Sequence, residues 1–254
     1  MNFIRQRVQS GQLSAGAWCN LGSSLTVEMA CLAGFDWVLI DLEHGSSDFE
    51  TLVLQAGILS WSRTAAIVRI AWNEPPRFKR VLDLGVSGVM VPYVNNAVEA
   101  RQAARSMRYP PEGIRGVAYL NRSSGFGQNF KEYFQKANEG LLTIVQIETE
   151  EAVNNAAEIA GVEGVDVLFV GPLDLSVSLG IPQQFDHVRF MEALAAVVAA
   201  ARRSGKQAGI LVSGEDQLET MVERGFSFVA MGSDSGMVAA GMRKNIEAFR
   251  KHQH

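Results

Sequence analysis

The chain has little cysteine, no long apolar stretch and no basic cluster, and each absence excludes a class of protein. Only 2 of its 254 residues are cysteines, Cys19 and Cys31, and both lie in apolar segments, which argues against a disulfide-stabilised secreted scaffold. No run of 18 apolar residues occurs, and the first residues lack the apolar region of a signal peptide, so we expect a cytoplasmic protein that does not span a membrane. The net charge of -4 comes without a basic stripe, so nucleic acid and anionic membrane surfaces are poor partners.

What the chain does have is an alternation of short apolar runs and helical stretches. The runs are continuous, which is typical of parallel strands covered on both faces. The eight predicted strands span residues 15–20, 37–41, 65–70, 88–93, 142–148, 166–171, 207–212 and 226–232. Helical patterns span residues 24–34, 49–60, 75–84, 96–106, 150–160, 187–204, 215–224 and 235–251, and a further amphipathic helix is predicted within residues 1–11.

Eight strand–helix units in about 250 residues predict an α/β fold, a (β/α)8 TIM barrel with an extra N-terminal helix, and residues 1–254 as a single domain. An open doubly wound sheet is the alternative, but the segment after the first strand, NLGSSLT, lacks the GxGxxG spacing that such a sheet usually carries there. One connection, residues 107–140, is long enough to predict a functional loop, part of which we expect to reach the active face.

Polar residues gather where the predicted strands end. Because the carboxyl ends of the strands form the active face of such a barrel, these side chains are expected to converge. They are Asp41, Glu43 and His44 after the second strand, Arg69 at the third, Gln146 and Glu148 at the fifth, and Gly171, Pro172 and Asp174 at the sixth.

The scarcity of lysine and histidine at this face narrows the chemistry. A Schiff-base enzyme needs a lysine there, but Lys206, the lysine next to a predicted strand, lies at its N-terminal end. Zinc favours clustered histidine and cysteine, whereas the histidines other than His44 lie on a helix or in the C-terminal tail. Two carboxylates, Glu148 and Asp174, with Gln146 beside them, fit a hard divalent ion such as Mg2+, Mn2+ or Co2+ that acts as a Lewis acid on a carbonyl.

Two further roles follow from the residue types. His44 and Asp41 make a predicted acid–base dyad in which the carboxylate orients the ring. Arg69 would supply a permanent positive charge to a carbonyl oxygen that becomes an enolate. The structural alternatives are helix caps for Asp48, Ser233, Asp234, Glu148 and Asp174, and a supporting role for Glu43.

Four segments carry a longer pattern. They are AGFDWVLIDLEHGSSDFE (33–50), VPYVNNAVEARQAARSMRYPPEGIRGV (91–117), VQIETEEAVNN (145–155) and FVGPLDLSVSLG (169–180). These segments closely resemble the HpcH/HpaI family of metal-dependent pyruvate aldolases, in order and across nearly the whole chain. The resemblance is specific to the family and much less so to any one member.

The resemblance implies a barrel whose last helix is often exchanged between subunits, in a homo-oligomer that is a hexamer, a trimer of dimers. It implies Glu148 and Asp174 as metal ligands, Gln146 near the metal waters, His44 with Asp41 as acid and base, Arg69 as enolate stabiliser, and the backbone after Gly171 and Pro172, around Leu173, as the holder of the substrate carboxylate. The implied reaction is the cleavage or formation of 4-hydroxy-2-oxo acids, such as 4-hydroxy-2-oxoheptanedioate or 2-dehydro-3-deoxy-sugar acids, with pyruvate and an aldehyde as the products of cleavage.

The long connection departs from the family pattern. It reads NRSSGFG at residues 121–127, with Phe126 and Gly127 where a Trp-Gly pair is usual, although Arg122 matches. The identity of the aldehyde therefore stays open, and the candidates to shape its end of the pocket are Trp18, Tyr119, Asn121, Arg122 and Leu211. An oxaloacetate decarboxylase and an acyl-CoA ester lyase on the same barrel remain alternatives, as does a non-catalytic binding barrel, against which the intact ligand set argues.

Overall fold

The computed structural model describes residues 3–253 and contains a closed barrel of parallel strands. Each strand is hydrogen-bonded to the next, and β8 pairs with β1 to close the ring. The strands are β1 (Ser14–Cys19), β2 (Trp37–Asp41), β3 (Ala65–Arg69), β4 (Gly88–Val91), β5 (Leu142–Ile147), β6 (Val167–Val170), β7 (Gln207–Val212) and β8 (Phe228–Ser233). The predicted (β/α)8 barrel is confirmed.

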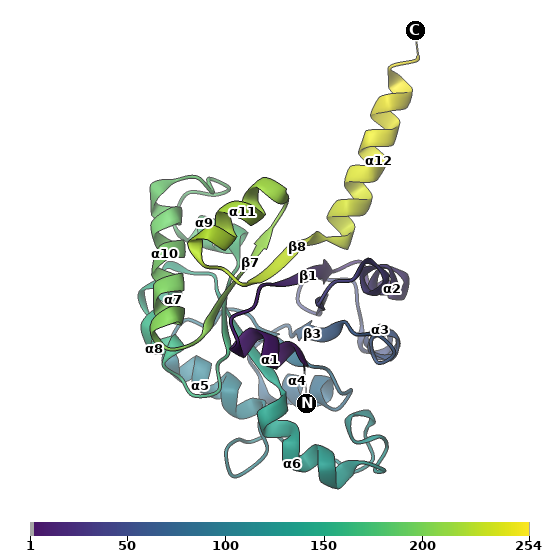
Figure 1. Cartoon of the computed structure of the whole chain (residues 1–254), viewed down its shortest axis with the longest axis vertical. Helices are drawn as coiled ribbons and strands as arrows, with labels where there is room; N and C mark the ends of the chain where they lie inside the picture. The colour runs from purple at the N-terminus through teal and green to yellow at the C-terminus, as the bar shows by residue number, and fades with distance from the viewer. Residues whose placement is uncertain (1–2, 254) are drawn as a thin grey trace.

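Helices surround this barrel, as Figure 1 shows. They are α1 (Phe3–Gln9), α2 (Ser24–Ala33), α3 (Phe49–Leu59), α4 (Pro75–Leu82), α5 (Ala97–Ser106), η1 (Arg122–Ser124), α6 (Phe130–Gly140), α7 (Glu150–Asn154), α8 (Ala156–Ala160), α9 (Pro172–Ser178), α10 (Val188–Arg203), α11 (Glu215–Arg224) and α12 (Asp234–Arg250). The helix predicted over 150–160 is divided at Asn155 into α7 and α8. None of the helices within residues 3–253 is long and apolar enough to cross a membrane.

Two hydrophobic clusters fill the fold, because successive strand residues point alternately into the barrel and out toward the helices. On β2, Leu39 belongs to the inner cluster, whereas Val38 and Ile40 belong to the outer one. The inner cluster also takes Ile4 and Val8 from α1, so the N-terminal helix closes the bottom of the barrel. This packing gives the predicted N-terminal helix its structural role.

Aromatic rings stack inside the barrel where glycine makes room for them. The ring of Trp37 lies parallel to that of Phe228, with centroids 4.1 Å apart. A Cβ atom at Gly16 would approach the Trp37 ring to 2.2 Å, so only glycine fits there. The barrel interior is thus a packed core below the face that carries the polar residues.

Helix starts follow the predicted capping residues closely. Asp48 caps α3 by accepting from the backbone N–H of Thr51, and Ser233 caps α12 by accepting from that of Gly236. Asp234 is buried and accepts instead from the hydroxyl of Thr26 at 2.7 Å and from the backbone N–H of Asn20 at 2.9 Å. It therefore ties the start of α12 to the segment after β1.

The long connection 107–140 lies at the N-terminal end of the barrel, and the prediction that it reaches the active face is wrong for this chain. Arg122 donates to the carbonyl oxygens of Ala56 and Leu84, and Ser123 N–H donates to that of Asp83. These acceptors lie at or near the last turns of α3 and α4, which lead into the starts of strands. The connection contains η1 and α6 and covers the end opposite the predicted site.

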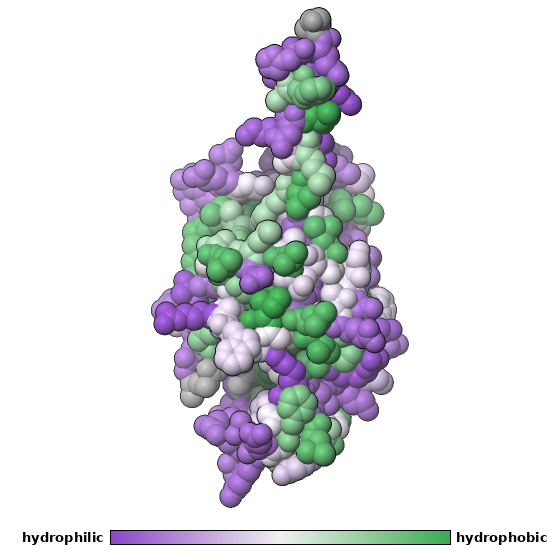
Figure 2. All heavy atoms as spheres, turned by 90° about the vertical axis from the view of Figure 1, so that its right-hand side faces the viewer, coloured by the Kyte–Doolittle hydropathy of each residue, from purple (hydrophilic) through white to green (hydrophobic). Residues whose placement is uncertain are grey.

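The last helix, α12, extends away from the barrel (Figure 1). It begins at the residue after β8 ends, so no loop exists in which the chain could turn back. Asp234 is its buried residue, and its large apolar side chains are exposed. Green apolar side chains occur along this helix and continue on the face below it in Figure 2.

Candidate active site

The uppermost inward-facing residues of the barrel are polar, although the layers beneath them are apolar. Asp41 follows Leu39 by two residues and Arg69 likewise follows Ile67, so both side chains take the inward direction. Asp41 and Arg69 are also partners in the register of β2 and β3. Strand alternation thus places these polar side chains at the upper end of the barrel interior.

Arg69 and Asp41 form a forked ion pair. Arg69 Nε lies 2.9 Å from Asp41 Oδ1, and Arg69 Nη2 lies 2.7 Å from Oδ2. Trp18 Nε1 also donates to Asp41 Oδ2 at 3.2 Å, and the guanidinium lies 4.7 Å from the centroid of the Trp18 ring. Burial raises the pKa of Asp41, but the hydrogen bonds and charge of Arg69 outweigh it, and the net pKa lies below its usual value.

The predicted contact between the side chains of His44 and Asp41 is wrong for this structure. Asp41 Oδ1 accepts from the backbone N–H groups of Glu43 and His44, at 3.0 and 3.3 Å. The His44 ring, 70% exposed, has Nε2 3.9 Å from Glu43 Oε1. The Asp41 carboxylate binds the Arg69 guanidinium, and the His44 imidazole lines the cavity without contacting Asp41.

Glu43 is more closely involved in the site than its sequence position indicated. Its Oε2 atom lies 2.9 Å from Arg69 Nη1, without hydrogen-bond geometry. Burial raises the pKa of Glu43, while Arg69 and His44 act to lower it. Glu43 therefore links the arginine to the histidine, a contact that no spacing in the sequence indicates.

The carboxylates of Glu148 and Asp174 lie on neighbouring elements, with Gln146 beside them. Glu148 is 2% exposed, and its Oε1 atom accepts from Gln146 Nε2 at 2.8 Å. Burial raises the pKa of Glu148 to about 7, and the negative charge of Asp174 adds to the effect. A Cβ atom at Gly171 would lie 2.4 Å from Glu148 Oε1, so glycine is needed for this approach.

Tyr93, for which the sequence predicts no role, contacts both carboxylates. Its backbone N–H donates to Glu148 Oε2 at 3.2 Å, and its hydroxyl donates to Asp174 Oδ1 at 3.4 Å. Tyr93 has a φ of 50°, a left-handed conformation that is uncommon outside glycine. Strained conformations of this kind cluster at active sites, and this one follows the end of β4 beside the two carboxylates.

A cavity of about 1240 Å3 joins these groups at the carboxyl ends of the strands. The predicted residues that line it are Trp18, Asp41, His44, Arg69, Gln146, Glu148, Gly171, Pro172, Leu173, Asp174 and Leu211. Tyr119, Asn121 and Arg122 are not among the lining residues, and the Arg122 guanidinium is bound at the other end of the barrel. A role for Arg122 in the substrate pocket of its own chain is therefore contradicted.

The residues present fit a divalent metal ion. Gln146 Oε1 is buried and has no hydrogen-bond partner, and it lies beside the buried carboxylate of Glu148. Within residues 3–253, no group of three or more histidine, cysteine or acidic side chains is arranged to hold a metal. Two carboxylates with open positions for water and substrate oxygens match the way proteins bind Mg2+.

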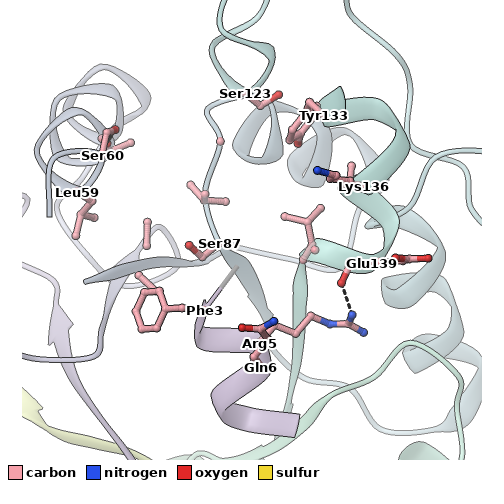
Figure 3. A pocket seen from close by; sticks show the side chains of 18 of the residues that line it. Phe3, Arg5, Gln6, Leu59, Ser60, Ser87, Ser123, Tyr133, Lys136 and Glu139 are labelled. Carbon is pink, nitrogen blue, oxygen red and sulfur yellow. Dashed lines mark hydrogen bonds between the residues drawn. The ribbon is translucent and has the colours of Figure 1, made fainter. Parts of the chain in front are cut away.

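A second cavity, of about 1000 Å3, lies at the opposite end of the barrel (Figure 3). Phe3 and Arg5 of α1 line one side, and Tyr133 and Lys136 of α6 line another. Arg5 points to the carbonyl oxygen of Glu139, to which it donates (Figure 3). None of the predicted site residues is among the described residues that line this cavity.

A (β/α)8 barrel with carboxylates, an arginine and a histidine at the carboxyl ends of its strands defines a barrel enzyme. The chain belongs to the HpcH/HpaI aldolase/citrate lyase family, whose profile matches residues 14–240. The predicted family, and with it the class of carbon–carbon lyases, is confirmed.

Individual relatives cover nearly the whole chain. The 5-keto-4-deoxy-D-glucarate aldolase of Klebsiella pneumoniae is 40% identical over 250 residues, which are 98% of this chain and 97% of that protein. The crystal structure of an HpcH/HpaI aldolase/citrate lyase family protein from Burkholderia cenocepacia superposes with a TM-score of 0.94 at 32% identity, covering 98% of this chain and 100% of that one. The citrate synthase SbnG superposes with a TM-score of 0.87 at 25% identity, over 98% and 97% of the two chains.

Proposed function

We propose that the protein cleaves 4-hydroxy-2-oxo acids to pyruvate and an aldehyde, with a divalent metal ion held by Glu148 and Asp174. The observation that carries the proposal is the pairing of these carboxylates, beside Gln146, in the same cavity as Arg69 and His44. Because the curated relatives are named for a keto-deoxy-sugar acid, we further propose a substrate of that class, such as 5-keto-4-deoxy-D-glucarate.

Arg69 would stabilise the negative charge of the enolate, in the same cavity as the carboxylates that would hold the metal. A divalent cation supplies Lewis-acid polarisation of the keto oxygen when it is bound. Arg69 cannot lose its charge, and Asp41 holds its guanidinium in a fixed orientation. Removing one such preorganised group costs about 10²–10³ in rate, so we expect that loss from a variant without the Arg69 charge.

His44 would move the proton of the cleavage step. Its exposed ring accepts the proton of the substrate 4-hydroxyl, the bond between C3 and C4 breaks, and the aldehyde leaves. The electron pair stays on the pyruvate part as an enolate, and the proton that His44 accepted is returned to C3, so that the protons balance. Glu43, 3.9 Å from the ring, stabilises the imidazolium in this proposal, in place of Asp41.

The rest of the substrate would be held by backbone and apolar groups. The first N–H groups of α9, at Leu173 and Asp174, have no acceptor within the helix and suit the substrate carboxylate. Trp18 and Leu211 line the same cavity and suit the aldehyde end.

The test is pyruvate release from a panel of 4-hydroxy-2-oxo acids, measured with a coupled lactate dehydrogenase. Metal-stripped protein should be inactive and should recover with Mg2+, Mn2+ or Co2+. Glu148→Gln should stay inactive with metal, whereas Glu132→Gln, which changes an exposed carboxylate paired with Lys136, should retain wild-type turnover. Full turnover in metal-free buffer, or in Glu148→Gln, contradicts the proposal.

We propose in addition a homo-oligomer, a hexamer built from dimers that exchange α12. The apolar side chains exposed on this helix are Met237, Val238, Met242, Ile246 and Phe249. A 17-residue helix with so much exposed apolar surface is stable where a second copy covers it. A cytoplasmic location is also proposed, in keeping with the free thiols of Cys19 and Cys31.

A further inference from the structure

Tyr93 is the residue whose main chain and side chain contact different members of the carboxylate pair. The backbone N–H binds Glu148 Oε2 at 3.2 Å, and the phenol hydroxyl binds Asp174 Oδ1 at 3.4 Å. Glu148 follows β5, and Asp174 lies in α9. Tyr93, which follows β4, therefore connects two parts of the chain that come later in the sequence.

The local structure around Tyr93 holds it in the orientation that makes both contacts. With a φ of 50°, the backbone N–H of Tyr93 points to Glu148 while its hydroxyl reaches Asp174. Asn95 Nδ2 donates to the Tyr93 carbonyl oxygen at 3.2 Å, and Asn95 is in turn bound by the hydroxyl of Thr149. The ring packs beside Trp72, with centroids 6.0 Å apart.

Holding this conformation costs free energy, on the order of 1–3 kcal/mol for a non-glycine residue in a sparsely populated backbone region. Tyr93 is 36% exposed, so burial of its ring is not what keeps it there. The contacts to the two carboxylates are the interactions that the conformation makes available.

We propose that Tyr93 is a positioning residue that sets the separation and direction of Glu148 and Asp174, so that both face one divalent ion. The inference rests on the proposed function, in which these carboxylates bind the metal. Without the hydroxyl, Asp174 Oδ1 loses a hydrogen-bond donor, and the rotamers of Asp174 broaden.

Removal of a partner that orients a metal ligand typically costs about 10–100-fold in metal affinity or activity. The contact at 3.4 Å is long and involves a neutral donor, so we expect the lower end, about tenfold in the Mn2+ dissociation constant. The backbone contact to Glu148 survives any side-chain change that keeps the backbone conformation, so binding weakens without being lost.

The experiment compares Tyr93→Phe with Tyr119→Phe. Both changes delete one phenol hydroxyl, but Tyr119 is exposed in the connection at the opposite end of the barrel and packs on Phe130. The measurements are the Mn2+ dissociation constant by calorimetry, the melting temperature of the metal-free protein, and kcat and KM at saturating Mn2+.

For Tyr93→Phe we expect about tenfold weaker Mn2+ binding, a melting temperature unchanged in the absence of metal, and partial recovery of kcat at saturating Mn2+. Tyr119→Phe should match the wild type in all three. An unchanged Mn2+ dissociation constant in Tyr93→Phe, or a loss matched by a lower melting temperature of the metal-free protein, overturns the positioning role.

Asp174→Asn separates this inference from the proposed function. If Asp174→Asn loses Mn2+ while Tyr93→Phe binds it as the wild type does, only the role of Tyr93 is wrong. If Asp174→Asn binds Mn2+ normally, the metal site itself is wrong and the inference falls with it.

Discussion

Replacing Arg69 by methionine should destabilise the fold as well as stop the reaction. The change keeps an unbranched apolar stem but leaves Asp41, 1% exposed, without its forked partner. Removing one member of a buried ion pair lowers the free energy of unfolding by about 3–5 kcal/mol. In chains of this size each kcal/mol corresponds to about 2–4 °C in the melting temperature, so we expect the melting temperature to fall by about 6–20 °C. Trp18 Nε1 still donates to the carboxylate, which favours the lower half of that range.

The stability lost in Arg69→Met should depend on pH, because the ion pair changes the pKa of Asp41. In the wild type the pKa of Asp41 is below its usual value, so its stabilising contribution is present at neutral pH and is lost as the pH falls through the folded-state pKa. Without Arg69, burial raises the pKa of Asp41 above that of the unfolded chain, so the variant loses less stability on acidification. The difference between the two proteins should therefore narrow between pH 8 and pH 5.

Scanning calorimetry of metal-free protein at pH 8, 6.5 and 5 measures both effects. Arg77→Met is the matched control, because Arg77 forms an exposed pair with Glu74, 47% and 53% exposed, and should change stability by less than about 1 kcal/mol. Asp41→Asn combined with Arg69→Met should recover part of the loss. An equal fall in melting temperature at all three pH values, or a fall no larger than that of Arg77→Met, would refute the reasoning.

Three further predictions concern the metal, a thiol and the last helix. Burial raises the pKa of Glu148 to about 7 in the metal-free protein, so below that pH Mn2+ must displace a proton from this carboxylate in order to bind. Calorimetry should therefore show that the affinity for Mn2+ falls from pH 8 to pH 6, and an affinity that stays constant contradicts this prediction. Burial raises the pKa of Cys19 to about 12, so at pH 8 iodoacetamide should label it, by mass spectrometry, only after unfolding; rapid labelling of folded protein would show that the thiol is accessible. A Gly-Ser loop of four residues inserted between Ser233 and Asp234 should let α12 fold back and yield smaller species in light scattering, and an unchanged oligomer argues against helix exchange.

The strands could be predicted because their signal is local. The run WVLID, residues 37–41, is apolar from Trp37 to Ile40 because β2 is buried on both faces, and its bounds match the prediction. The capping role of Asp48 is equally local, since a side-chain oxygen reaches the N–H group three residues ahead. The convergence of polar residues at one end of the barrel could be predicted as well, since Asp41 and Arg69 lie at strand ends and strand alternation directs both side chains inward.

The predictions that are wrong concern contacts with segments distant in the sequence. Arg122 matched a family motif, but the direction of the connection 107–140 is set by where it packs against α3 and α4. Asp41 and His44 are three residues apart, and the short spacing suggested a dyad, yet a fixed cation 28 residues along the chain binds the carboxylate more strongly than a neutral ring would. Tyr93 carried no signal beyond its place at a strand end.

From the sequence alone follow the eight buried strands, the helices between them, the barrel that their number implies, and the set of polar residues at the strand ends. These features depend on the period of hydrophobicity and on hydrogen bonds within a few residues, which neighbouring residues determine. Which of those residues touch, as in the Arg69–Asp41 fork and the contacts of Tyr93 with Glu148 and Asp174, was decided only by the closed barrel. The reason is that its register brings side chains tens of residues apart to within 3 to 4 Å, and short-range charge and hydrogen bonding then select the partners.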